Sequence, residues 1–287
     1  MSADAETLVI GAVAYDPKVV TIWEGFRVWF RDHGLPSTYL LYANYEQQVE
    51  DLLAGHIHVA WNSPLAWVRA RRLAAAKGIS VQPLVMRDSD CDLTSVIAVR
   101  SDSSIQSAAD LRGKVIGTGA LDSPQATLIP LAHLRGAGLS TRDFEVRRFD
   151  IGVGLHGDHI GGEREAARAL MSGQTDAASM LDANHLAFSR DGTLPAGSTR
   201  IVVQTPRYDH CMMTAGPSAP PALVRRLTDL LLSMSYADPE VRPLLDLEGL
   251  KAWLPGRTTG YGQLESATDL LGFYDKVGNV LADDYRP

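Results

Sequence analysis

The sequence lacks several features that mark particular classes of protein. It has two cysteines in 287 residues, Cys91 and Cys211, which are too few for a disulfide framework. Its net charge is −7, and it contains no basic run of the kind that binds nucleic acid. No apolar run approaches the length of a membrane span. We therefore expect a globular protein with free thiols, no nucleic-acid partner and no membrane insertion.

The first residues also lack the features of a secretory leader. Met1 to Thr7 carry no basic charge and no apolar core. Free thiols fit a reducing compartment, so we expect a cytoplasmic protein. The alternative is a periplasmic or extracellular protein whose leader is missing from this sequence. A transporter partner is expected only in that second case.

A regular alternation of strands and helices follows. Residues 8–14, 38–42 and 81–86 are short apolar runs typical of buried strands, with helical patterns between them. Such alternation predicts an α/β fold with a parallel sheet and helices on both faces. The length is sufficient for two modest domains.

One stretch, residues 45–68, organises this pattern. It combines a helix, a glycine at the helix end (Gly55), an apolar strand and a second helix that begins at Ser63 and Pro64. A similar helix–glycine–strand unit recurs at residues 162–181, with Gly173 at the helix end. The two copies predict two similar lobes.

The position of the second copy suggests how the lobes divide the chain. We expect lobe one to contain residues 1–99 and 211–287, with residues 100–210 inserted as lobe two. Two crossings between lobes would form a hinge, and the cleft between lobes is a common place for a ligand.

Three predicted helices begin in the same way. Asp16-Pro17, Ser63-Pro64 and Ser123-Pro124 each place a capping side chain before a proline, at the end of a predicted strand. Helix N-termini at the carboxyl ends of strands favour anions. Each pair alone is simply a good helix start, but the three together predict an anion site.

These motifs resemble a known family. The pattern of residues 45–68, an Ala/Leu-rich helix, a glycine, a strand and then Ser-Pro-Leu-Ala-Trp-Val, is similar to the phosphate/phosphonate substrate-binding family of type II periplasmic binding proteins. The resemblance extends more loosely over residues 8–250 and includes residues 107–117. His58 departs from it, because the family commonly has Asp there. The resemblance implies a two-lobe type II periplasmic-binding-protein-like α/β fold with an interlobe cleft and a hinge.

The resemblance also implies a function, the hinge-closing binding of a small anionic metabolite that bears a phosphonate, phosphate or carboxylate. No cofactor is expected. Pro124 and Gln125 depart from the family's loop of Ser, Thr and Gly, so the ligand need not be a simple phosphonate. In lobe two, the residues expected to hold the anion are Ser123, Gln125 and Thr127. The residues expected to contact the rest of the ligand are Tyr15, Trp61, Asn62, Ser63 and His156.

The histidines support an alternative, a cytoplasmic enzyme of the same fold. His156, His185 and His210 are candidates for acid/base chemistry on a small organic acid. A metal site at His156, His159 and His185 is not favoured, because the HxxH spacing lies in a loop. Cys211 as a nucleophile is less favoured than Cys211 as a buried strand residue. A ligand sensor that signals to a partner protein is a third hypothesis.

Overall fold

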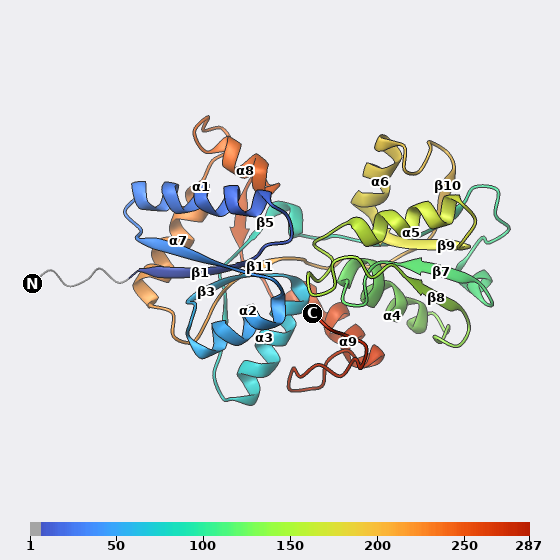
Figure 1. Ribbon diagram of the computed structural model, residues 1–287, viewed down its shortest axis with the longest axis horizontal. Helices are drawn as coiled ribbons and strands as arrows, with labels where there is room; N and C mark the ends of the chain where they lie inside the picture. The colour runs from blue at the N-terminus through green and yellow to red at the C-terminus, as the bar shows by residue number, and fades with distance from the viewer. Residues whose placement is uncertain (1–6) are drawn as a thin grey trace, which may run out of the picture. The chain divides into compact units, whose positions relative to one another are not determined.

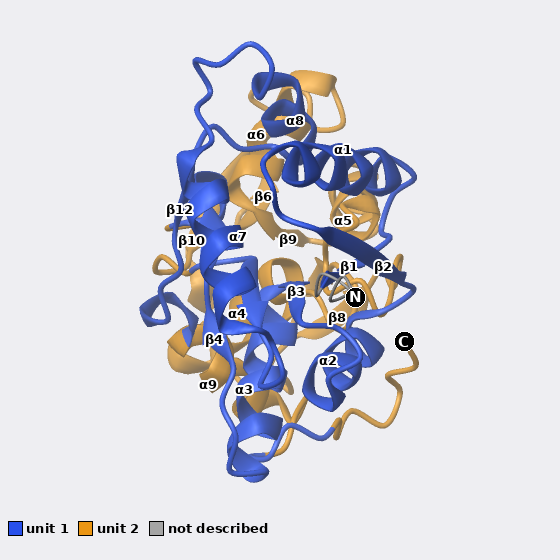
Figure 2. Ribbon diagram, turned by 90° about the vertical axis from the view of Figure 1, so that its left-hand side faces the viewer, with its two compact units in different colours: residues 1–91, 209–261, 276–279 blue, residues 92–208, 262–275, 280–287 orange. Residues whose placement is uncertain are grey.

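The computed structural model describes residues 7–287, which divide into two compact units (Figure 2). Unit 1 comprises residues 1–91, 209–261 and 276–279, and unit 2 comprises residues 92–208, 262–275 and 280–287. Most of the segment on which the leader interpretation rests, Met1 to Glu6, lies outside the described residues.

Unit 1 contains a five-stranded sheet in the order β2-β1-β3-β11-β4. Its strands are β1 (Leu8–Val13), β2 (Ser37–Tyr42), β3 (Val59–Asn62), β4 (Gln82–Pro83) and β11 (Met212–Ala215). Strand β1 is parallel to β2 and β3, whereas β11 is antiparallel to β3 and β4. A separate pair, β5 (Val85–Arg87) and β12 (Trp253–Pro255), is antiparallel.

Helices cover both faces of this sheet, as predicted (Figure 1). They are α1 (Lys18–Asp32), α2 (Tyr45–Ala54), α3 (Pro64–Ala76), α7 (Pro221–Ser233) and α8 (Arg242–Glu248). Helices α1 and α7 share an apolar core with β1 and β3, in which Phe26 and Trp61 both contact Trp253. Helices α2 and α3 lie on the opposite face.

The organising stretch has the local structure that the sequence predicts. Asn44 caps α2, and Gly55 ends it in a left-handed conformation with φ 84°. The Ser63 Oγ accepts a hydrogen bond of 3.1 Å from the Ala66 N–H, with Pro64 in the first turn of α3. Strand β3 therefore runs directly into a capped helix.

Unit 2 contains a second five-stranded sheet, in the order β10-β6-β9-β7-β8. Its strands are β6 (Ser95–Arg100), β7 (Val115–Thr118), β8 (Glu145–Arg148), β9 (Ala177–Leu181) and β10 (Thr199–Gln204). Its helices are α4 (Ile129–Gly136), α5 (Gly161–Met171), α6 (Asp182–Asp191) and α9 (Gly262–Leu271). Helices α5 and α6 pack on one face, and α4 packs on the other with α9 (Figure 1).

The second helix–glycine–strand copy is α5, Gly173 and β9. Gly173 adopts a φ of 74°, like its counterpart Gly55. Strands β3 and β9 each occupy the middle position of their sheet. The two copies are therefore equivalent parts of two similar α/β units, as the sequence predicted.

The boundaries of the units differ from the expected lobes. Strand β6 pairs with β9 and β10, so residues 92–99 belong to unit 2 and not to lobe one. Residues 262–275 and 280–287 also belong to unit 2, where α9 packs against α4. An apolar strand pattern shows that a strand is buried, but its hydrogen-bonded partners decide which sheet it joins.

Three of the predicted elements begin or break differently. Helix α1 starts at Lys18 with Pro17 as its N-cap, while the Asp16 Oδ1 accepts a 2.9 Å bond from the Lys18 N–H. The strand expected at 81–86 is divided between β4 and β5, which join different sheets. The helix expected at 125–135 begins with a π-helical turn, Pro124–Leu128.

Gly162, in the first turn of α5, permits the close approach of that helix to the segments that follow β7 and β8. An added Cβ would lie 2.6 Å from the Phe149 carbonyl oxygen. We predict that Gly162→Ala lowers the free energy of unfolding by about 1–3 kcal/mol through overpacking. The matched control is Gly136→Ala in α4, where nothing lies within 4 Å and helix propensity favours alanine. Urea denaturation should separate the two variants, and equal stabilities would contradict this account.

Candidate ligand-binding site

Ser123 caps the helical segment that follows β7. Its buried Oγ accepts a 3.2 Å hydrogen bond from the Ala126 N–H, and its carbonyl accepts bonds from the Thr127 and Leu128 N–H groups. A hydroxyl that accepts one bond can still donate another. Ser123 is therefore suited to donate to an anion at this helix start.

Gln125 and Thr127 make hydrogen bonds that hold the same loop. The Gln125 Nε2 donates to the Gly157 carbonyl at 2.7 Å, and the Gln125 carbonyl accepts from the Ser95 hydroxyl at 2.6 Å. The Thr127 hydroxyl donates to the Ala120 carbonyl at 2.8 Å. Its proton thus shapes the loop, and the anion-binding role of Thr127 stays a prediction.

The glycine-rich loop of unit 2 is anchored on Asp122. The Asp122 Oδ2 accepts hydrogen bonds from the N–H groups of Gly154 (2.7 Å) and His156 (3.1 Å). His156 is buried with a φ of 50°, and its Nε2 lies 3.3 Å from the Tyr285 hydroxyl. The loop brings His156 into the same unit as Ser123.

Gly157 makes the contact between this loop and the helix start. An added Cβ would lie 2.5 Å from the Ser123 Oγ and 2.6 Å from the Gln125 Nε2, and its φ is 78°. Both the close approach and the left-handed backbone favour glycine here. The loop therefore packs directly against two of the predicted anion-binding residues.

Three polar residues that the sequence analysis missed lie at the same edge of this sheet. Tyr208 places its hydroxyl 2.6 Å from that of Ser95, and burial raises the pKa of Tyr208, as do the carboxylates of Glu163 and Asp182. The buried Glu163 accepts hydrogen bonds from the Leu181 N–H and the Asn184 side chain. The missed residues are Asp122, Glu163 and Tyr208. In the sequence, Asp122 directly precedes a helix cap, Glu163 lies in the first turn of a helix and Tyr208 follows β10. These positions were the only indication of a role in the site.

Asn62 is the last residue of β3 in unit 1 and is fully buried. Its Oδ1 accepts a 3.0 Å hydrogen bond from the Gln48 Nε2. The Asn62 Nδ2 and the Gln48 Oε1 are buried and have no hydrogen-bond partner among the described residues. A buried amide with unused polar atoms is suited to bind a ligand.

The other residues predicted in unit 1 are placed differently. Trp61 lies in the core, with its ring centroid 5.6 Å from that of Trp253 and the Arg87 guanidinium over its ring, and its ligand-binding role stays a prediction. Ser63 serves as the cap of α3. Tyr15 is half-buried, with the Lys18 Nζ 5.7 Å from its ring centroid.

The candidate catalytic histidines are divided between the units. His156 and His185 belong to unit 2, and His210 belongs to unit 1. His185 lies on α6 with its Nε2 3.0 Å from the Thr199 hydroxyl, and burial lowers its pKa. The His210 Nδ1 lies 3.2 Å from the Cys211 Sγ.

The structure does not bring His156, His159 and His185 together. His159 is exposed, and its Nδ1 accepts from the Gly161 N–H. Within residues 7–287, one group of three metal-ligating side chains meets, and it consists of Asp90, His210 and Cys211.

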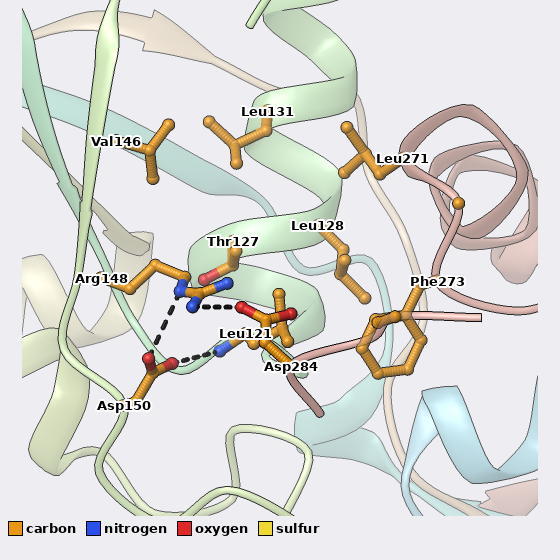
Figure 3. A pocket seen from close by; sticks show the side chains of 12 residues that line it. Leu121, Thr127, Leu128, Leu131, Val146, Arg148, Asp150, Leu271, Phe273 and Asp284 are labelled. Carbon is orange, nitrogen blue, oxygen red and sulfur yellow. Dashed lines mark hydrogen bonds and ion pairs between the residues drawn. The ribbon is translucent and has the colours of Figure 1, made fainter. Parts of the chain in front are cut away.

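A separate pocket of about 580 Å³ lies within unit 2 (Figure 3). At one end Arg148 forms ion pairs with Asp150 at 3.3 Å and with Asp284 at 2.5 Å. Thr127 lines this pocket, whereas Ser123, Gln125 and His156 do not. Its apolar wall consists of Leu121, Leu128, Leu131, Val146, Leu271 and Phe273.

A family model described as the periplasmic substrate-binding protein of a phosphonate ABC transporter matches residues 14–261. The chain belongs to this family. This membership confirms the resemblance noted in the sequence, the α/β fold of two units and the general class of function, a binding protein for a small anion. No curated protein sequence matches the chain.

Solved structures of other proteins share the fold. PhnD1 from Prochlorococcus marinus, in complex with methylphosphonate, is 17% identical, with a TM-score of 0.69 over 93% of this chain and 98% of that one. A Xanthomonas citri protein bound to ATP is 18% identical, with a TM-score of 0.70 over the same shares. The aliphatic sulphonate binding protein SsuA from Escherichia coli is 17% identical, with a TM-score of 0.59 over 93% and 87%.

Family membership bears on location as well. The family is described as periplasmic, which does not support the expected cytoplasmic location and agrees with the alternative of an exported protein. Among residues 7–287, no helix is both long enough and apolar enough to cross a bilayer.

Asp122 should make the free energy of unfolding depend on pH. Burial raises the pKa of Asp122 above its ordinary value of 3.8, so the native state holds this proton more tightly than the unfolded chain. Its contribution to stability therefore falls as pH rises from about 4 through the raised pKa. We predict that the free energy of unfolding of Asp122→Asn, relative to the unmodified protein, increases with pH across this window.

Asp143 is the matched control for this measurement. Hydrogen bonds from Ser140 lower the pKa of Asp143, so its contribution rises with pH. In the same urea-denaturation series, the relative stability of Asp143→Asn should therefore fall as pH rises towards about 4 and then stay level across the window in which Asp122→Asn gains stability. Parallel pH profiles for the two variants would refute the assignment of Asp122.

Proposed function

We propose that the chain binds a small anionic metabolite with a phosphonate, phosphate or carboxylate group at the Ser123 helix start. The observation that carries this proposal is the buried Ser123 hydroxyl, which caps a helix start at the carboxyl end of β7. The positive end of the helix dipole favours an anion there, and the Ser123 hydroxyl is the donor. Gln125 and His156, which belong to the same unit as Ser123, are the proposed neighbours of the anion.

The chemistry of the structural relatives supports this proposal. Methylphosphonate, ATP and aliphatic sulphonates all carry a tetrahedral oxyanion centred on phosphorus or sulfur. Such a group needs several convergent donors, which a hydroxyl and backbone amides can supply. Because the family is described as part of an ABC transporter, we also propose a periplasmic location and a transporter as the recipient of the ligand.

Acidic residues near the proposed site restrict the ligand further. The carboxylates of Glu163 and Asp182 both raise the pKa of Tyr208. The Tyr208 hydroxyl is hydrogen-bonded to the Ser95 hydroxyl, which donates to the Gln125 carbonyl. These carboxylates would repel an anion that carries no positive group. We propose that the preferred ligand is zwitterionic, with an ammonium group beside its phosphonate or phosphate.

Removal of the Ser123 hydroxyl should weaken anion binding. We predict that Ser123→Ala lowers the affinity for 2-aminoethylphosphonate by about ten-fold, roughly 1–2 kcal/mol, in a calorimetric titration. Thr228→Ala is the control, since it deletes a hydroxyl that bonds the Val224 carbonyl within α7. Equal affinities of both variants and the unmodified protein would rule out this anion site.

The same sample separates binding from turnover. A binding protein releases the ligand with its mass unchanged, whereas the enzyme alternative at His156, His185 or His210 requires a changed mass. Mass spectrometry of the ligand after prolonged incubation should therefore recover 2-aminoethylphosphonate intact. A converted product that depends on the protein would favour the enzyme.

A zwitterionic preference should depend on Glu163. We predict that the unmodified protein binds 2-aminoethylphosphonate about ten-fold more tightly than methylphosphonate, because only the former carries an ammonium group. Glu163→Gln should reduce this ratio while it retains acceptors for the Leu181 and Asn184 bonds. Glu165→Gln, which changes an exposed neighbour on α5 paired with Arg168, should leave the ratio unchanged. Tighter binding of methylphosphonate would contradict the preference.

A further inference from the structure

Asp90, His210 and Cys211 form a buried cluster in unit 1, apart from the proposed anion-binding residues of unit 2. One ligand atom from each lies within 4.8 Å of the other two. Their exposed fractions are 2%, 8% and 1%. The residues come from two segments that adjoin the points where the chain leaves unit 1 after Cys91 and re-enters it at Asp209.

Two of the three donor separations in this cluster are close to those of a tetrahedral metal site, and the third is within 4.8 Å. The His210 Nδ1 lies 3.2 Å from the Cys211 Sγ and 3.5 Å from the Asp90 Oδ1. Zinc bonds of about 2.0–2.3 Å in a tetrahedron give ligand separations of roughly 3.4–3.6 Å. The three donor atoms can therefore approach one ion with little movement.

The same geometry argues against a nucleophile relay through His210. A relay of Cys, His and Asp needs one ring nitrogen for the thiol and the other for the carboxylate. Here Nδ1 faces both the Cys211 Sγ and the Asp90 Oδ1. Three donors that converge on one point suit a cation better than a proton transfer.

Surrounding hydrogen bonds hold these donors in position. The His210 N–H donates to the Asp90 carbonyl at 2.8 Å, and the Tyr261 hydroxyl donates to the His210 carbonyl at 2.8 Å. Arg87 binds the Asp90 carboxylate through two nitrogens, at 2.6 and 3.0 Å. A carboxylate oxygen has lone pairs for both an arginine and a metal, so Arg87 orients the ligand from outside.

The buried charged groups around this cluster have an excess of negative charge that a cation would balance. Arg87 also contacts Glu248 at 3.2 Å, so one guanidinium faces two carboxylates. These three groups carry a net charge of −1, and a Cys211 thiolate would add another negative charge. Buried net charge is costly unless it is compensated. A divalent ion would balance this cluster.

We propose that Asp90, His210 and Cys211 bind a divalent transition metal, with Zn²⁺ as the best match. One nitrogen, one sulfur and one oxygen donor form a ligand set that zinc accepts in tetrahedral sites, with a fourth position left for water or another ligand. The ion would join the two segments through which the chain connects its units.

Metal content tests the proposal without any assumption about the anionic ligand. Untagged full-length protein, stripped with a chelator, is mixed with ZnCl₂ in its native state and also refolded in the presence of ZnCl₂, since the site is buried. Inductively coupled plasma mass spectrometry after gel filtration should find one zinc per chain. Cys211→Ser and His210→Gln should each weaken zinc binding on the order of 100-fold.

Cys91→Ser is the matched control, because it removes the other cysteine and should retain one zinc per chain. Cobalt gives a second readout on the unmodified protein, where a thiolate-to-cobalt charge-transfer absorption should appear. No zinc after either loading protocol, or zinc that survives in both cluster variants, would overturn the proposal. A cobalt complex without the thiolate absorption would overturn it as well.

Discussion

The burial of one central strand on both faces is the constraint on which each unit depends. Strand β3 is buried at all four positions, and β9 is buried at four of its five. Such strands are mostly apolar along their length, although the buried Ser179 lies within β9, so most of their polar groups appear where they end. Asn62 is the last residue of β3, Ser63 follows it, and Asp182 follows β9. This is why polar side chains gather at the carboxyl edges of both sheets.

In unit 2, a buried carboxylate organises the loop that faces the proposed anion site. The ionisation of Asp122 is opposed by burial, and amide hydrogen bonds from Gly154 and His156 partly offset that cost. The loop that these bonds hold then places Gly157 against Ser123 and Gln125. A buried Asp122 therefore stabilises this region less than an apolar side chain at the same position would, but its hydrogen bonds fix the position of the loop. This trade is common at binding sites.

Unit 1 carries its buried charges at a different place. Arg87, Asp90 and Glu248 form an ion-pair network beside the segments through which the chain enters and leaves the unit. Asp90 and His210 are 120 positions apart in sequence, yet they share a backbone hydrogen bond. The proposed metal site depends on the proximity of Asp90 and His210, which no spacing motif in the sequence predicts.

The sequence by itself determined the elements that local chemistry controls. The helix–glycine–strand units at Gly55 and Gly173, the serine caps at Ser63 and Ser123 and the glycine-rich loop were all predictable, because caps, left-handed glycines and apolar runs act over a few residues. Only the tertiary structure decided which sheet β6 joins, that Trp61 is a core residue and that Thr127 donates to Ala120. It also brought Asp122, Glu163 and Tyr208 to one edge of a sheet. Those outcomes depend on contacts between distant segments, and an apolar or polar pattern does not specify its partners.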